Sequence, residues 1–187
     1  MKVPFIFRSP LTRLCVAGVG GCLGMSLAFA GPEEDNARAK VEFERGDLPA
    51  SLSLWRKAAQ AGYAPSQVWL GDILDKGDED VEAAAWYQKA ADQGNADGEY
   101  GLGQMYLKGE GVKKDAEKAL LYFERAATRN HVDSVKVMMA AYRQGSMGLP
   151  INQAQADAWE AKLVAILPGY TKSVPKTDGK PPKGAPQ

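Results

Sequence analysis

The sequence predicts an all-α fold, a right-handed α/α solenoid of about four two-helix repeats. One pattern occurs at residues 55–62, 87–94 and 123–130: an aromatic residue, a basic residue two positions later, an Ala pair, and a final Gly or Asn. Self-similarity at a nearly constant period indicates a stacked array, because a single unit cannot bury its apolar face alone. Such arrays usually present an extended binding surface.

The repeated pattern is the end of the second helix of each unit. Apolar residues recur there in alternating steps of three and one, which is the spacing of one helical face. Small Ala side chains let neighbouring helices approach, and an aromatic side chain fills the space beside them. We therefore expect the following residues to be buried: Ala83, Trp86, Tyr87, Ala90 and Ala91 in the second unit, and Ala119, Tyr122, Phe123, Ala126 and Ala127 in the third.

The first helix of each unit has a pattern of its own, at residues 70–77, 102–109 and 138–145. Its second position is Gly71 or Gly103, where the absence of a side chain allows a partner helix to pack closely. In the fourth unit this position is Met139 instead, and a terminal Gly ends the segment each time.

Helix ends are also predicted by residue type. Gly and Asn accept the left-handed conformation that ends a helix, and Asp and Asn accept the free backbone N–H groups at a helix start. The predicted stops in the second helices are Gly62, Gly94 and Asn130, and the predicted N-caps are Asp47, Asp115 and Asn152.

These markers divide the chain into units at about residues 34–62, 63–94, 95–130 and 131–167. The first and fourth depart most from the pattern, as terminal caps of a repeat array do. In the fourth, Trp159 replaces the tyrosine and Leu163-Val164 replace the Ala pair.

Residues 1–30 have the features of a secretory signal peptide. A basic start is followed by an apolar, Gly-rich run, and small residues at positions 28 and 30 predict cleavage after Ala30. This places the protein in the periplasm. A lipoprotein attached at Cys22 is the less favoured alternative, because mostly apolar residues follow that cysteine. Both cysteines lie in the leader, so the chain from Gly31 on has no thiol.

Charge separates the remaining chain into two parts. The solenoid region, residues 31–167, has a formal charge of −6, whereas residues 168–187 are rich in Pro, Gly and Lys with a charge of +3. The acidic region speaks against nucleic acid as a partner. The composition of residues 168–187 predicts a disordered tail, which could contact an anionic envelope polymer weakly. We expect a monomer.

The third unit resembles the Sel-one-like repeat family, a branch of the tetratricopeptide-like α/α solenoids. The family's first-helix pattern matches residues 102–109, its Gly-x-Gly-Val-x-x-Asp loop matches residues 109–115, and its second-helix pattern matches residues 118–127. The second unit lacks this loop, and the fourth lacks the Ala pair. The resemblance implies an adaptor, scaffold or regulator that binds other proteins on the concave face of the solenoid, which the first helices line.

The functional expectation is a non-enzymatic scaffold of the bacterial cell envelope that binds a protein or peptide. Exported members of the family also include immunity proteins against toxic effectors, which is the alternative. A cell-wall hydrolase or penicillin-binding activity is less favoured, because the cysteines of the penicillin-linked branch are missing. We expect no cofactor, no metal and no catalytic residue. The single histidine, His131, has no second His or Cys to form a site with and is interpreted as a solvent-facing turn residue.

The candidate binding residues are the side chains of the first helices that differ between units. Of these, aromatic residues are the usual anchors of interfaces, although burial between repeats is the more common reason for them. The differing positions are Val68, Trp69, Asp72, Ile73, Tyr100, Gln104, Met105, Lys108, Lys136, Ala140, Arg143 and Gln144. The predicted partner contacts are Trp69, Tyr100, Gln104, Lys108 and Lys136.

Overall fold

The computed structural model describes residues 31–170, and these form helices without any strand. The predicted signal peptide and nearly all of the predicted tail lie outside the described residues. The helices are α1 (Pro32–Glu44), α2 (Leu48–Gln60), α3 (Ala64–Lys76), α4 (Asp80–Asp92), α5 (Ala96–Lys108), α6 (Ala116–Thr128), α7 (Val132–Gln144) and α8 (Gln153–Ile166).

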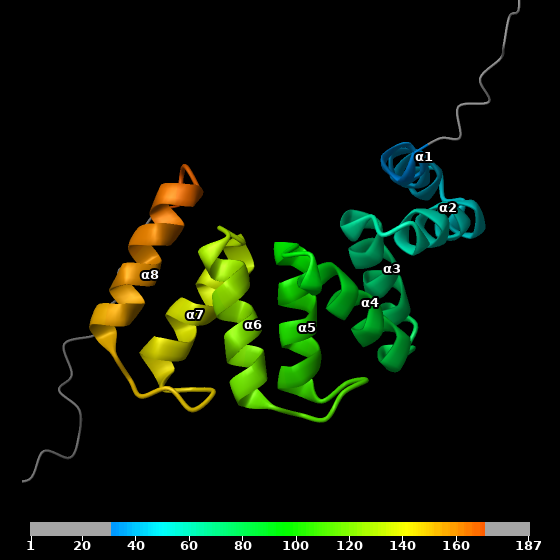
Figure 1. The fold of residues 1–187 in the computed structure, drawn as a ribbon. Coiled ribbons are helices and arrows are strands. Elements are labelled where there is room, and N and C mark those ends of the chain that lie inside the picture. Colours follow the sequence, from blue (N-terminus) through cyan, green and yellow to red (C-terminus); the bar gives the residue numbers. More distant parts are fainter. Residues whose placement is uncertain (1–30, 171–187) are drawn as a thin grey trace, which may run out of the picture.

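Consecutive helices pack as pairs, α1 with α2, α3 with α4, α5 with α6 and α7 with α8. Figure 1 shows the pairs following one another along an arc, with α1 and α2 at one end and α8 at the other. Each pair also contacts the next, and α3 touches α5 directly across the boundary between units. The all-α repeat solenoid that the sequence predicts is therefore confirmed.

The predicted helix ends are confirmed almost throughout. The side chains of Asp47, Asp115 and Asn152 each accept a hydrogen bond from a backbone N–H in the first turn of α2, α6 and α8. Gly62, Gly94 and Asn130 have φ values of 90°, 73° and 69°, the left-handed conformation expected after α2, α4 and α6. One position differs: after α3 the left-handed residue is Asp78, with φ of 59°, and not Gly77.

The aromatic side chains of the second helices lie against the glycines of the first. A Cβ atom added at Gly71 would stand 2.8 Å from the Tyr87 ring, and one at Gly103 would stand 2.9 Å from the Phe123 ring. Both rings are at most 4% exposed. The predicted close approach at these glycines is confirmed. Among the residues expected to be buried, Tyr122 is only half-buried, because its ring stacks on that of Tyr106 at the surface.

A methyl group has no room at these glycines. Gly103→Ala should lower the free energy of unfolding by about 1–3 kcal/mol, because the new Cβ overlaps the Phe123 ring. Gly77→Ala is the matched control, since its Cβ would meet nothing closer than 3.4 Å. Urea unfolding of both variants measures the difference; equal losses would show that the ring contact is not the cause.

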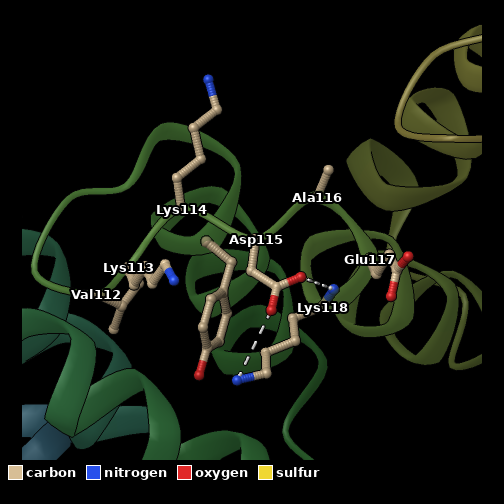
Figure 2. Close-up of a pocket in the computed structure, with 8 residues that line it drawn as sticks. Val112, Lys113, Lys114, Asp115, Ala116, Glu117 and Lys118 are labelled. Carbon is tan, nitrogen blue, oxygen red and sulfur yellow. Dashed lines mark hydrogen bonds and ion pairs between the residues drawn. The ribbon is translucent and has the colours of Figure 1, made fainter.

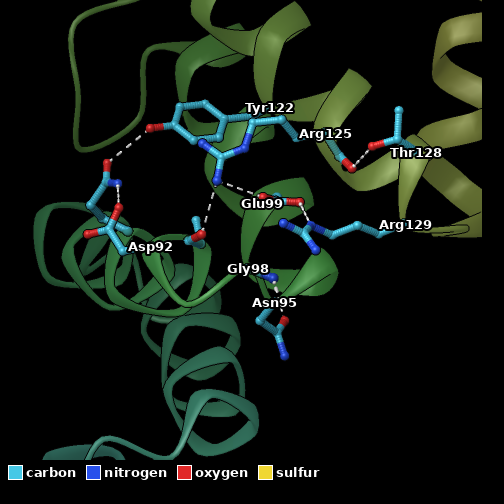
Figure 3. Close-up of polar contacts among 10 residues, drawn as sticks. Asp92, Asn95, Gly98, Glu99, Tyr122, Arg125, Thr128 and Arg129 are labelled. Carbon is cyan, nitrogen blue, oxygen red and sulfur yellow. Dashed lines mark hydrogen bonds and ion pairs between the residues drawn. The ribbon is translucent and has the colours of Figure 1, made fainter.

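One buried carboxylate joins the two helices of the third unit. Glu99 of α5 is fully buried, and its two oxygens lie 2.8 Å from Arg125 Nη2 and 3.2 Å from Arg129 Nε of α6 (Figure 3). Arg125 also donates a hydrogen bond to the carbonyl oxygen of Ala91 in α4. The buried charge is thus neutralised, and one of its partners also ties the third unit to the second.

The second unit has a neutral pair in the same place. Gln67 corresponds to Glu99 and Gln93 to Arg129, and Gln93 Nε2 donates a hydrogen bond of 2.7 Å to Gln67 Oε1. Gln67 in turn donates to the carbonyl oxygen of Ala59 in the first unit. These two positions therefore require side chains that bind each other. Either a charged pair, Glu99 with Arg129, or an amide pair, Gln67 with Gln93, meets this requirement.

This equivalence predicts a rescue. Arg129→Gln alone should destabilise the protein by about 2 kcal/mol, because a buried carboxylate loses one of its two cations. Adding Glu99→Gln should restore most of that loss, because it recreates the Gln67–Gln93 arrangement. Thermal unfolding of the single and double variants forms a double-mutant cycle; strictly additive losses would contradict the equivalence.

Candidate functional site

The first helices of the second and third units form a pocket between them. It has a volume of about 360 Å³, which is within the range of ligand pockets in proteins. We call it the α3–α5 pocket. Its lining comes from α3, α5, the start of α7 and one residue of α4: Val68, Trp69, Asp72, Asp75, Tyr87, Asp97, Tyr100, Gly101, Gln104 and His131.

The ring of Tyr87 packs between the two first helices. A Cβ at Gly71 of α3 or at Gly101 of α5 would lie within 2.8 Å of this ring. The hydroxyl group of Tyr87 donates a hydrogen bond of 2.7 Å to Asp72 Oδ1. Burial, together with this bond to a carboxylate, raises the pKa of the Tyr87 hydroxyl. Tyr87 is therefore a permanent donor that holds the Asp72 side chain in the pocket.

The pocket is acidic. Burial raises the pKa of Asp72, and the neighbouring carboxylates of Asp75 and Asp97 raise it further against the lowering effects of Tyr87 and Lys76. The pKa of Asp75 is also raised, mainly by burial, although Lys108 opposes the shift. Burial is therefore the main cause that disfavours the charged forms of these two carboxyl groups.

His131 differs from the expectation. It is not solvent-facing: its side chain is 16% exposed, and its ring lies 4.6 Å from the ring of Tyr100. It is the N-cap of α7, with Nδ1 accepting the backbone N–H of Ser134 at 3.2 Å. Because Nδ1 is an acceptor, Nε2 carries the proton and faces Asp97 Oδ1 at 3.4 Å. The histidine thus completes one end of the pocket rather than a turn at the surface.

The structure brings three of the five predicted contact residues together. Trp69, Tyr100 and Gln104 all line the α3–α5 pocket and are half-buried. Lys108 and Lys136 do not line it. Lys108 is paired with Glu110 at 2.8 Å and Lys136 with Asp133 at 2.8 Å, both at exposed positions. Binding by any of the five remains a prediction.

Two of the other listed positions belong to the core instead. Val68 is 9% exposed and Met105 is 2% exposed, so their variation between units reflects packing. The acidic residues Asp75 and Asp97 were missed as members of the site. Their charge alone gave no signal, because acidic residues on a helix are usually solvated; only the approach of α3 and α5 places them around one cavity.

Larger or more apolar hollows elsewhere are less suited to a specific ligand. One of them, of about 610 Å³, lies over residues 112–118. There Asp115 caps α6 and pairs with Lys118, while Lys114 extends away from the others (Figure 2). Two of the polar residues that line the hollow, Asp115 and Lys118, already bind one another. A small apolar hollow of about 380 Å³ lies between α5 and α7, lined by Leu107, Val137 and Ala140 among others.

Residues 31–170 contain no group of three or more His, Cys, Asp or Glu side chains arranged to hold a metal ion. Within the same range no helix has the length and apolarity required to cross a membrane.

Comparison with protein families agrees with this architecture. The model of the Sel1 repeat matches residues 44–63, 64–95 and 96–131. This chain contains Sel1 repeats. The matched segments begin one residue after the predicted starts of the second and third units. The pair α7 and α8 lies outside the match, in agreement with Met139 and Leu163 at positions where the repeat has Gly and Ala.

Solved structures show the same fold. A Sel1 repeat protein from Oxalobacter formigenes superimposes with a TM-score of 0.68 at 23% identity, over 74% of this chain and 60% of that one. A protective antigen of uropathogenic Escherichia coli with this fold gives a TM-score of 0.67 at 27% identity, over 73% of this chain and 31% of the antigen.

Curated relatives are longer proteins. Chitin synthase regulatory factor 3 of Schizosaccharomyces pombe is 30% identical over 65% of this chain and 14% of its own length. The chitin synthase regulator SKT5 of Saccharomyces cerevisiae is 29% identical over 68% of this chain and 19% of its own length. An uncharacterised protein of Neisseria meningitidis is 29% identical over 68% of this chain and 27% of its own. The chain therefore spans between about a seventh and a quarter of these relatives.

Trp69 is the residue whose two roles are easiest to separate. Its ring stacks on that of Trp55 at 4.8 Å with an angle of 3° between the planes, while one face of the residue lines the pocket. Trp69→Ala should lower the free energy of unfolding by about 2 kcal/mol, less than for a fully buried ring. Trp69→Phe, which keeps a ring against Trp55, should lose less. Unchanged stability of Trp69→Ala in thermal unfolding would show that the stack does not support the fold.

Proposed function

We propose that this Sel1 repeat protein is a non-enzymatic interaction module of the bacterial cell envelope. It binds a protein or peptide segment on the surface formed by its first helices α3, α5 and α7, which we call the first-helix face. Sel1 repeat proteins are generally protein-interaction scaffolds, and two of the relatives are named as regulators of another protein. The observation that carries the proposal is the α3–α5 pocket, which lies on this face where the units differ.

The repeat scaffold supports this choice of surface. The residues shared by the units pack between helices and are not available to a partner. They are the Ala pairs, the glycines and the second-helix aromatics. The first-helix face keeps half-buried aromatic and polar side chains, Trp69, Tyr100 and Gln104, which are the residue types that anchor interfaces. A rigid array that presents them needs no folding on binding, which favours affinity.

Export is part of the proposal. The pattern of residues 1–30 supports a cleaved signal peptide and a periplasmic location. Mass spectrometry of the protein purified from its native host tests this, because a mature chain that begins at Gly31 is expected. A lipid-modified chain beginning at Cys22 would contradict it.

Site-specific crosslinking tests the proposed binding face. A photo-reactive amino acid at Gln104 should give a discrete crosslinked product in living cells, because Gln104 lines the pocket on the first-helix face. The matched control is the same amino acid at Leu121, an exposed position of the second helix α6. Products of equal yield at both positions, or none at either, would contradict binding through this face. Identification of the product by mass spectrometry, followed by reconstitution with the purified partner, gives the affinity.

A further inference from the structure

The acidic character of the α3–α5 pocket is not a requirement of the repeat. Asp72 corresponds to Gln104 in the third unit and to Ala140 in the fourth, and Asp75 corresponds to Leu107 and Arg143. The hollow between α5 and α7 accordingly has an apolar lining that includes Leu107 and Ala140. The two hollows use corresponding helices of the same scaffold, so the carboxylates are a property of one place on the first-helix face.

Asp72 and Asp75 have no cation in direct contact, although Lys76 and Lys108 lie near enough to lower their pKa values. Within residues 31–170, neither Asp72 nor Asp75 forms an ion pair with a Lys or Arg side chain, and the nearby Lys108 is paired with Glu110. Asp97 is exposed to solvent, and its Oδ1 lies 3.4 Å from His131 Nε2. Elsewhere the molecule neutralises buried acids efficiently, as Arg125 and Arg129 do for Glu99. Asp72 and Asp75 differ in this respect from Glu99, which contacts two arginine side chains.

The remaining residues that line the pocket also suit a cationic side chain. Trp69 and Tyr100 contribute aromatic rings, whose faces attract a cation and whose edges pack on an aliphatic side-chain stem. Gln104 adds an amide that can accept or donate a hydrogen bond. The volume of about 360 Å³ accommodates one long side chain together with part of its backbone.

We propose that the α3–α5 pocket recognises a Lys or Arg side chain of an extended segment of a partner protein, with Asp72 and Asp75 as the anionic contacts and Trp69 and Tyr100 as the aromatic walls. This inference rests on the proposed function and specifies the chemistry of the partner. Charge complementarity carries it: a cationic side chain in the pocket would form the direct ion pair that Lys76 and Lys108, which act on Asp72 and Asp75 from beyond ion-pair distance, do not form.

Short peptides test the pocket without knowledge of the partner. The probes are an N-acetylated, C-amidated Gly-Ser-Lys-Ser-Gly peptide, the same peptide with Arg, and the same peptide with norleucine, which keeps the aliphatic stem without the charge. In NMR titrations of the purified full chain, the Lys and Arg peptides should shift the amide signals of Gly101 and Gln104, with dissociation constants on the order of 1 mM. The norleucine peptide should bind at least about tenfold more weakly.

Charge variants make the test specific. Asp72→Asn with Asp75→Asn should lower the affinity for the Lys peptide at least about tenfold. The variant keeps an acceptor oxygen for the Tyr87 hydroxyl and removes charges whose burial is unfavourable, so the fold should persist. Glu117→Gln with Asp157→Asn is the matched control, because it removes the same net charge at exposed positions of α6 and α8. Equal losses in both double variants would overturn the inference, since they would show only long-range attraction.

Three further outcomes are decisive. The chain itself contains a basic segment, residues 171–187. If the Lys peptide binds only after this segment is deleted, the segment and not a partner is the occupant, and the inference is overturned. If the peptides do not bind although Gln104 crosslinks a partner, the proposed function stands and the cationic recognition fails. If the peptides bind but no crosslink forms, the binding face rather than the pocket chemistry is in error.

Discussion

The structure depends on the contact between an aromatic ring of the second helix and a glycine of the first helix in the second and third units. The rings of Tyr87 and Phe123 lie so close to Gly71 and Gly103 that a single methyl group cannot be added. Dense packing of this kind fixes the distance and angle between the two helices of a unit. Tyr87 also contacts Gly101 of the next unit, so the same ring sets the spacing from one unit to the next.

This constraint explains where variation between units is tolerated. Side chains that contact the neighbouring unit are small or form matched pairs, and a change on one side requires a change on the other, as Gln67 with Gln93 and Glu99 with Arg129 illustrate. Positions on the first-helix face are less constrained, because they are only partly buried. They hold an acid, an amide or an apolar residue in different units, and local chemistry can therefore differ along one rigid surface.

The α3–α5 pocket results from both properties. Glycine at position 101 leaves room for the Tyr87 ring, and the ring delivers a hydroxyl that holds Asp72. In the second unit the corresponding position is Trp69. Its ring stacks on that of Trp55, and the residue lines the pocket. Trp69 in the second unit thus forms a wall of the pocket, whereas Gly101, which has no side chain, leaves space at the corresponding position of the third unit.

The sequence alone determined the helices, their ends and their pairing, because these depend on local signals: helical spacing of apolar residues, Asx caps such as Asp115, and Gly or Asn after a helix. It also predicted Trp69, Tyr100, Gln104, Lys108 and Lys136 as partner contacts from their variation between units, and this stays a prediction because core positions such as Met105 vary as well. It misplaced His131 and overlooked Asp75 and Asp97. Only the tertiary structure decided these, because the capping of α7, the ring contact with Tyr100 and the meeting of three carboxylates depend on how closely consecutive units approach, and no local pattern encodes that distance.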